Sequence, residues 1–334
     1  MTRTTTDSPT GHRPRVGLAL GSGSARGLAH LGVIRAIEDA GIEIDFIAGT
    51  SMGALTGAIH AAGQLDELQA AFRAFDWRRM ISFFDVVLPK SGLLDGASVS
   101  ELVRAYIHAD SIETLPIPFA AVATDIVSGE EVVIRNGDVI EAVRASISVP
   151  GIFTPVRSNG RILVDGGLTN PVPVSVARAM GADIVIAVDL NHQIIAGKNM
   201  KPLLPAAKPS DAEERAIGIF SRWVGDYRLS MKDIRQKLLA GDNPASAQFR
   251  KWVSAEPLPS IFEVLLASIN IMETRITQTR LHLDKPDVLI QPPLGNIRFL
   301  EFGRAEEIIA IGYEHTQRQL ASLPIDTFVR RRTP

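Results

Sequence analysis

The 334-residue chain is 46% apolar and 22% charged, an ordinary composition for a globular protein with a large core. Its length permits one large α/β domain or two domains. Its formal net charge of −2 gives no reason to expect a nucleic acid as partner. The lack of cysteine excludes disulfides, thiolate catalysis and cysteine-ligated zinc. No stretch approaches the roughly 20 uninterrupted apolar residues of a membrane span. We therefore expect a cytoplasmic protein.

A polar N-terminal segment precedes the first predicted element. Residues 1–14 lack the apolar stretch of a secretory signal and are predicted to form a disordered tail. Val16–Leu20 is a short apolar run that predicts a buried strand, and it leads into the loop Gly21-Ser22-Gly23-Ser24-Ala25-Arg26-Gly27. From Leu28 to a stop signal at Gly41 the apolar spacing is helical.

The 21–27 loop has two interpretations. One is a phosphate cradle at a helix N-terminus, but the dinucleotide fingerprint G-x-G-x-x-G fits in neither register and no P-loop motif is present. The other is an oxyanion hole, because small residues expose consecutive backbone N–H groups. The neighbouring elements must decide between the two.

Ser51 lies at a predicted sharp turn between a strand and a helix. The strand Ile44–Ala48 is followed by Gly49-Thr50-Ser51-Met52-Gly53, which fits G-x-S-x-G, and then by a helical pattern. A βαβα opening predicts a mostly parallel sheet, in which the turns after adjacent strands emerge at the same carboxyl edge. The 21–27 loop and Ser51 can therefore face each other, which favours acyl transfer.

The middle of the chain alternates further helices and strands. Trp77–Gly92 mixes aromatic and basic residues and would either touch lipid or be buried under a loop. Asp165-Gly166-Gly167 follows a strand predicted at Arg161–Val164 and either only ends that strand or contributes a carboxylate. The other elements expected before residue 191 are helices at Asp66–Phe75, Ala97–Ile107, Ile140–Ile147 and Val174–Met180, and strands at Ile117–Asp125, Glu131–Arg135 and Ala182–Leu190.

The composition changes after residue 191. Residues 15–191 are expected to form the catalytic core, and residues 192–334 to add a helical insertion or lid and C-terminal elements that complete the same domain. Apolar stripes on the two longest helices would either pack in the core or form a lid or membrane-docking face. The expected elements are a mobile loop at Gln193–Asp211, helices at Glu213–Leu239, Ile261–Leu283 and Ala305–Leu320, and a strand at Asp287–Gln291.

A nucleophilic serine needs a base, and the chain offers two kinds. An α/β-hydrolase would place a histidine after Asp165, but none of the candidates His192, His282 and His315 sits in a motif that would position it. Such an enzyme also reaches its nucleophile after several strands, whereas Ser51 follows only two. We therefore favour Asp165 as a base that takes the proton directly, with close placement and shielding from water offsetting its weak basicity.

Three motifs occur in the order and spacing of the patatin-like phospholipases: GSGSARG at 21–27, GTSMG at 49–53 and DGG at 165–167. The chain resembles the bacterial neuropathy-target-esterase-like branch of that family, over about residues 15–191 and again within 284–320. The resemblance implies a three-layer α/β/α fold with a mostly parallel central sheet and a helical C-terminal extension. It also implies hydrolysis of acyl esters of phospholipids or lysophospholipids, without a metal or another cofactor.

The resemblance implies a role for each motif. Ser51 would be the nucleophile, Asp165 the base, and the N–H groups of Ser22, Gly23 and Ser24 the oxyanion hole. Family members usually have glycines where Ser22 and Ser24 stand, so the loop is strained if either serine needs a positive φ. Arg26 matches a basic position of the family and is either an exposed charge, a support for the loop or an attractor of anionic head groups. The supporting positions are Gly21, Arg26, Gly27, Gly49, Gly53, Gly166 and Gly167.

Two non-catalytic alternatives stay open. The 21–27 loop could serve a regulatory module that binds a nucleotide or another phosphate, or the chain could be a degenerate scaffold that binds lipid without cleaving it. As a hydrolase, the protein is expected to meet a phospholipid or another acyl ester, with peripheral contact to the inner face of the membrane.

Overall fold

The computed structural model describes residues 13–68, 97–107, 109–193 and 261–324. The chain forms two compact units, one of residues 1–198 and 268–334 and one of residues 199–267, and of the second unit only residues 261–267 are described. Several predicted segments lie wholly or mostly outside the described residues: the tail at 1–14, the helix at 66–75, the segment at 77–92, the loop at 193–211 and the helix at 213–239.

A mixed sheet of eight strands forms the centre of the first unit. Its order is β5-β6-β3-β2-β1-β7-β8, with β4 paired to β3. From β3 to β8 the neighbouring strands are parallel, whereas β4, β5 and β6 pair antiparallel, so the predicted mostly parallel sheet is confirmed. The strands are β1 (Val16–Leu20), β2 (Phe46–Thr50), β3 (Phe119–Asp125), β4 (Glu131–Ile134), β5 (Val156–Ser158), β6 (Arg161–Asp165), β7 (Ile184–Val188) and β8 (Val288–Ile290).

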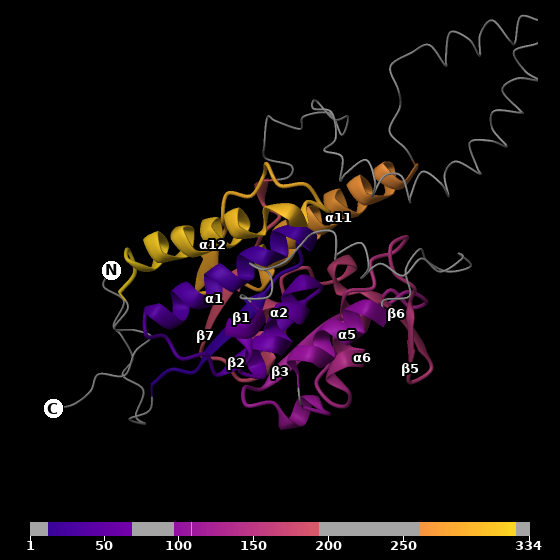
Figure 1. Ribbon diagram of the computed structural model, residues 1–334, viewed down its shortest axis with the longest axis horizontal. Coiled ribbons are helices and arrows are strands. Elements are labelled where there is room, and N and C mark those ends of the chain that lie inside the picture. Colours follow the sequence, from indigo (N-terminus) through magenta and orange to yellow (C-terminus); the bar gives the residue numbers. More distant parts are fainter. Residues whose placement is uncertain (1–12, 69–96, 108, 194–260, 325–334) are drawn as a thin grey trace, which may run out of the picture. The chain divides into compact units, whose positions relative to one another are not determined.

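Helices cover both faces of this sheet, which confirms the three-layer α/β/α fold (Figure 1). Successive side chains of a strand point to opposite faces, so Leu18 and Leu20 enter one core and Ala19 enters the other. The first core is closed by α1, α2, α5, α6 and α12, and the second by α7 and Leu281 of α11. The helices are α1 (Ala29–Asp39), α2 (Met52–Ala61), α5 (Ala97–Tyr106), α6 (Val139–Ser146), α7 (Val174–Ala179), α11 (Ile261–Leu283) and α12 (Ala305–Leu320).

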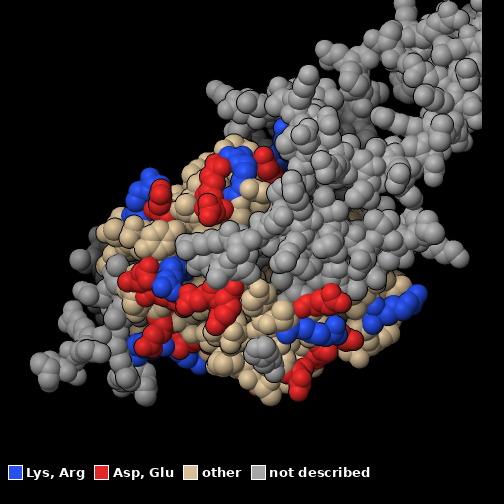
Figure 2. All heavy atoms as spheres, viewed as in Figure 1, with Lys and Arg blue, Asp and Glu red and all other residues tan. Residues whose placement is uncertain are grey.

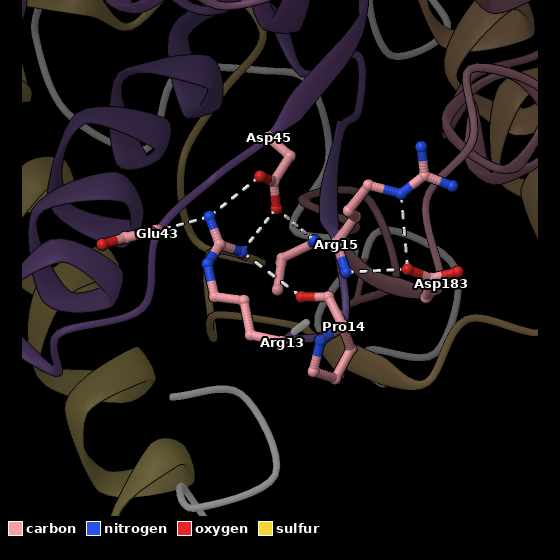
Figure 3. Close-up of polar contacts among 7 residues, drawn as sticks. Arg13, Pro14, Arg15, Glu43, Asp45 and Asp183 are labelled. Atoms are coloured by element: carbon pink, nitrogen blue, oxygen red, sulfur yellow. Dashed lines mark hydrogen bonds and ion pairs between the residues drawn. The ribbon is translucent and has the colours of Figure 1, made fainter. Parts of the chain in front are cut away.

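Charged side chains secure the edge at which the parallel strands begin (Figure 3). Arg13 donates to both carboxylate oxygens of Asp45, at 2.7 and 2.8 Å, and Asp45 also accepts the N–H of Val16 at 2.7 Å. The N–H of Arg15 donates to Asp183 at 2.8 Å. The starts of β1, β2 and β7 are thereby tied together, at the edge opposite to the one where the turn at Ser51 emerges.

The surface carries charges of both signs. Figure 2 shows acidic and basic side chains interspersed on the face in view, outside the grey atoms. Among the described residues, no helix is long and apolar enough to cross a membrane.

Candidate active site

Ser51 occupies a strained turn between β2 and α2. Its φ of 57° and ψ of −123° belong to a conformation that residues other than glycine rarely adopt. Two hydrogen bonds hold this turn: the N–H of Ser51 donates to Ser146 Oγ at 2.9 Å, and that hydroxyl donates to the carbonyl of Val122 at 2.5 Å. The turn is thus fixed to β3, as a strand, sharp turn and helix arrangement requires.

The side chains of Ser51 and Asp165 meet. Ser51 Oγ donates to Asp165 Oδ2 at 2.6 Å, and the two residues are only 5% and 2% exposed. Register brings them together, because Thr50 pairs with Val122 and Asp165 pairs with the next residue of β3, Ala123. Asp165 is the last residue of β6, and β6 runs antiparallel to β3, so it reaches Ser51 from a strand of opposite direction.

The carboxyl group of Asp165 is both shielded and hydrogen-bonded. Burial raises its pKa from 3.8 to about 6, and the hydroxyl of Ser51 and the N–H of Gly167 oppose this rise. The Gly167 N–H donates to Oδ1 at 2.7 Å, which leaves Oδ2 to Ser51. At neutral pH the carboxyl group is therefore ionised and shielded from solvent.

The backbone of the 21–27 loop offers fewer free donors than predicted. The N–H of Ser22 donates to the carbonyl of Pro171 at 2.8 Å, so it is committed elsewhere and our assignment of Ser22 as an oxyanion donor is wrong. Among the described residues, the N–H groups of Gly23 and Ser24 have no recorded partner. The loop packs on the start of α2, where Gly27 lies against the side chain of Met52.

Strain in this loop falls on one serine. Ser24 has a φ of 47°, in the left-handed region that favours glycine, whereas Ser22 does not. The loop was expected to be strained if either serine had a positive φ, and Ser24 has one. A residue with a side chain there replaces the usual glycine.

Arg26 supports the loop from inside the protein. It is 3% exposed, and its guanidinium donates to the carbonyl of Ile297 at 3.1 Å and to Asn270 Oδ1 at 3.0 Å. Burial lowers its pKa to about 10, against the opposing effect of Glu273 and Asp189. Of the three predicted roles, an exposed charge at a helix start is thus wrong, and these contacts agree with a support for the loop.

Two side chains that the sequence analysis did not identify also touch the loop. His30 on α1 binds the carbonyl of Gly21 at 2.7 Å, and since burial lowers the pKa of His30 to about 4, the neutral ring donates from Nε2. Glu273 on α11 accepts the hydroxyl of Ser22 at 3.0 Å and the side-chain amide of Asn191 at 3.3 Å. Neither residue lies in one of the three motifs.

Close backbone approaches explain the glycines of the motifs. A β carbon on Gly53 would collide with the carbonyl of Leu20, and one on Gly166 with the carbonyl of Val122. The turn after β2 can therefore pack against β1 only with a glycine at position 53, and the turn after β6 can pack against β3 only with a glycine at position 166. A β carbon would likewise meet close neighbours at Gly21, Gly27, Gly49 and Gly167.

The histidines considered as alternative bases do not join the site. Asp165 is the one side chain recorded in hydrogen-bond contact with Ser51 Oγ among the described residues. His282 is exposed, and His192 and His315 are half-buried. In the same described part of the chain, no group of three or more histidine, aspartate or glutamate side chains could hold a metal ion.

Comparisons with known proteins identify relatives of the chain. A family model described as patatin-like phospholipase matches residues 18–178. An uncharacterised NTE family protein of Mycobacterium tuberculosis is 33% identical over 336 residues, which cover 94% of this chain and 93% of the relative. Human patatin-like phospholipase domain-containing protein 6 is 25% identical over 90% of this chain, but the match spans only 20% of that protein. The crystal structure of VipD from Legionella pneumophila is a more distant match, with a TM-score of 0.42 and 15% identity over 94% of this chain and 67% of VipD.

Proposed function

The chain belongs to the patatin-like phospholipase family, and from this premise we propose that it is a serine lipolytic acyl hydrolase that cleaves phospholipids or lysophospholipids. The observation that carries the proposal is the 2.6 Å hydrogen bond between Ser51 and Asp165, two buried side chains on separate motifs. A serine on a strained turn beside a shielded carboxylate is the arrangement that nucleophilic catalysis needs.

In the proposed acylation step, Ser51 Oγ attacks the carbonyl carbon of the ester while its proton passes to Asp165 Oδ2. The carbonyl oxygen becomes negative and accepts hydrogen bonds from the N–H groups of Gly23 and Ser24, helped by the positive end of α2. Collapse of the tetrahedral intermediate breaks the ester C–O bond. The alcohol leaves with the proton from Asp165, and the acyl group stays on Ser51.

In the proposed deacylation step, water replaces the alcohol. Asp165 takes a proton from the attacking water, the same N–H groups stabilise the second oxyanion, and the bond between the acyl carbon and Ser51 Oγ breaks. The proton returns to Ser51 as the fatty acid leaves. The cycle therefore consumes one water and needs no other reactant.

The non-catalytic alternatives make different demands on these residues. A phosphate cradle would use the N–H of Ser22, which is occupied by the carbonyl of Pro171. A lipid-binding scaffold would have no use for a serine held at an unfavourable φ against a buried carboxylate. Both alternatives predict binding without release of fatty acid.

The test is hydrolysis of a monomeric ester and of phospholipid vesicles by the wild type and by Ser51→Ala and Asp165→Asn. Each substitution should lower kcat/KM by about a thousandfold or more, because it removes the nucleophile or its base. Ser128→Ala, an exposed serine at the β3–β4 turn, serves as the matched control and should keep full activity.

Thermal unfolding at pH 8 shows whether an inactive variant has lost a catalytic group or has lost its fold. The folded pKa of Asp165 lies above its unfolded value of 3.8, so its contribution to stability is present below pH 3.8 and is lost as the pH rises through about 6. At pH 8 the buried charge costs up to about 3 kcal/mol, and Asp165→Asn should melt above the wild type. Hydrolysis retained by either variant, or lipid binding without acyl release by the wild type, would contradict the proposal.

A further inference from the structure

Glu273 is a buried acid that the mechanism above does not use. It lies on α11, is 4% exposed, and reaches a loop 251 residues away in the sequence. Its Oε2 accepts from Ser22 Oγ at 3.0 Å and from Asn191 Nδ2 at 3.3 Å, and Asn191 also donates to Ser22 Oγ at 3.2 Å. The side chain of Ser22 is thus enclosed by two polar partners from distant parts of the chain.

The same carboxyl group faces Asp165 across Gly167. Asp165 Oδ1 lies 3.0 Å from the position that a β carbon on Gly167 would occupy, and Glu273 Oε1 lies closer still to that position. Two carboxyl groups therefore share one buried space. Two like charges in one buried space cannot both be ionised cheaply, so near neutral pH the pair holds one proton.

Burial and the like charge of Asp165 place that proton on Glu273. Burial and the neighbouring Asp165 raise the pKa of Glu273 to about 8, with the Ser22 hydroxyl and the Arg26 guanidinium opposing the rise, while the pKa of Asp165 is about 6. Arg26 is held by Asn270 and by a backbone carbonyl, and it also interacts with Asp189. The other groups facing Glu273 from the packed elements, Ser22, Asn191 and Gly167, are uncharged.

We propose that Glu273 is a positioning residue of this hydrolase, which in its protonated form anchors Ser22 of the oxyanion loop and leaves the single negative charge of the site on Asp165. The inference rests on the proposed function. Ionisation of Glu273 would add a second negative charge beside the place where the oxyanion develops, and this disfavours the transition state. The site should therefore be active only while Glu273 keeps its proton.

The experiment measures kcat/KM for a water-soluble monomeric ester between pH 5 and 9.5. The wild type should show a bell-shaped profile that rises through about pH 6, as Asp165 ionises, and falls above about pH 8, as Glu273 ionises. Glu273→Gln should keep the rise and lose the fall, so its ratio of activity at pH 9 to that at pH 7 should exceed the wild-type ratio about tenfold.

Two further variants make the test specific. Thr277→Val changes a buried residue one turn further along α11, whose hydroxyl has no partner in the described part of the chain, and it should show the wild-type profile. Glu273→Ala removes the anchor and should lower kcat about tenfold with little change in KM, a loss that glutamine should largely restore by accepting from Ser22. A purely structural glutamate would affect kcat and KM without altering the alkaline limb.

Each outcome bears on one proposal. If the activity of the wild type does not fall at alkaline pH, the role of Glu273 is overturned. The same holds if the activity of Glu273→Gln falls as steeply as that of the wild type. A wild type that releases no alcohol and no acid at any pH overturns the proposed function instead.

Discussion

Positive backbone angles mark three residues other than glycine in the described chain, Ser24, Ser51 and Asn159. Asn159 lies in the β5–β6 hairpin turn, where asparagine tolerates this conformation. Serine is not among the residues that favour a positive φ, so Ser24 and Ser51 are strained. Both belong to the site, one as the proposed nucleophile and one as a proposed oxyanion donor, so the strain is concentrated where the chemistry is proposed.

Ser24→Gly should stabilise the protein. Glycine adopts a positive φ without the steric cost that a β carbon incurs, so we expect the free energy of unfolding to rise by about 1 kcal/mol, measured by urea denaturation. Ser22→Gly is the matched control, since Ser22 has no positive φ and would lose its bonds to Glu273 and Asn191. That variant should be destabilised, and equal effects of the two substitutions would show that the backbone of Ser24 carries no strain.

At the scale of elements, the C-terminal helix secures the helix that follows the 21–27 loop. Figure 1 shows α12 running alongside α1. The two approach through glycines: a β carbon on Gly32 would collide with the carbonyl of Ile309, and one on Gly312 with the carbonyl of Ala29. His30, which binds the loop at Gly21, sits on the first turn of α1, between these contacts.

Gly312→Ala should therefore destabilise the fold by about 1–3 kcal/mol, because the added methyl group forces the two helices apart. The comparison is with Gly303→Ala, at a glycine with nothing within 4 Å of the added carbon, which should change the melting temperature little. If the two alanine variants melt together, the close packing of α1 on α12 is not a source of stability.

The elements with a clear period could be predicted from the sequence. The buried runs of β1 and β7 and the amphipathic pattern of α12 have the predicted positions, within a few residues. The three-residue strand β5 was missed, although Asn159-Gly160 is a strong hairpin signal, because so short a run has no measurable alternation. The direction of β6 was also missed, since a βαβα opening suggests that parallel pairing continues.

The candidate site was only partly predictable for a related reason. Motifs identify Ser51 and Asp165 because glycines lie on both sides of Ser51 and directly after Asp165 in the sequence. Glu273 lies in an ordinary helical pattern, and its partner Ser22 is 251 residues away, so nothing local marks it. The N–H of Ser22 likewise donates to the carbonyl of Pro171, and this contact exists only in the folded chain.

At the scale of the whole molecule, the site draws on both ends of the chain. The three motifs lie before residue 168, yet the 21–27 loop is secured by Glu273 and Asn270 on α11 and by backbone carbonyls at Ile297 and Phe299. Elements beyond residues 18–178, which the family model matches, thus hold the 21–27 loop in place. The N–H groups of this loop are the proposed oxyanion hole. This arrangement couples the geometry of the site to the folding of the C-terminal segment.

The most direct measurement is covalent labelling with a fluorophosphonate, followed by mass spectrometry of the labelled peptide. A serine activated by a buried carboxylate should carry the adduct on Ser51 alone, with a labelling rate that rises through about pH 6 and is abolished in Ser51→Ala. An adduct on another residue, or none on a protein that still hydrolyses esters, would contradict a Ser51–Asp165 dyad.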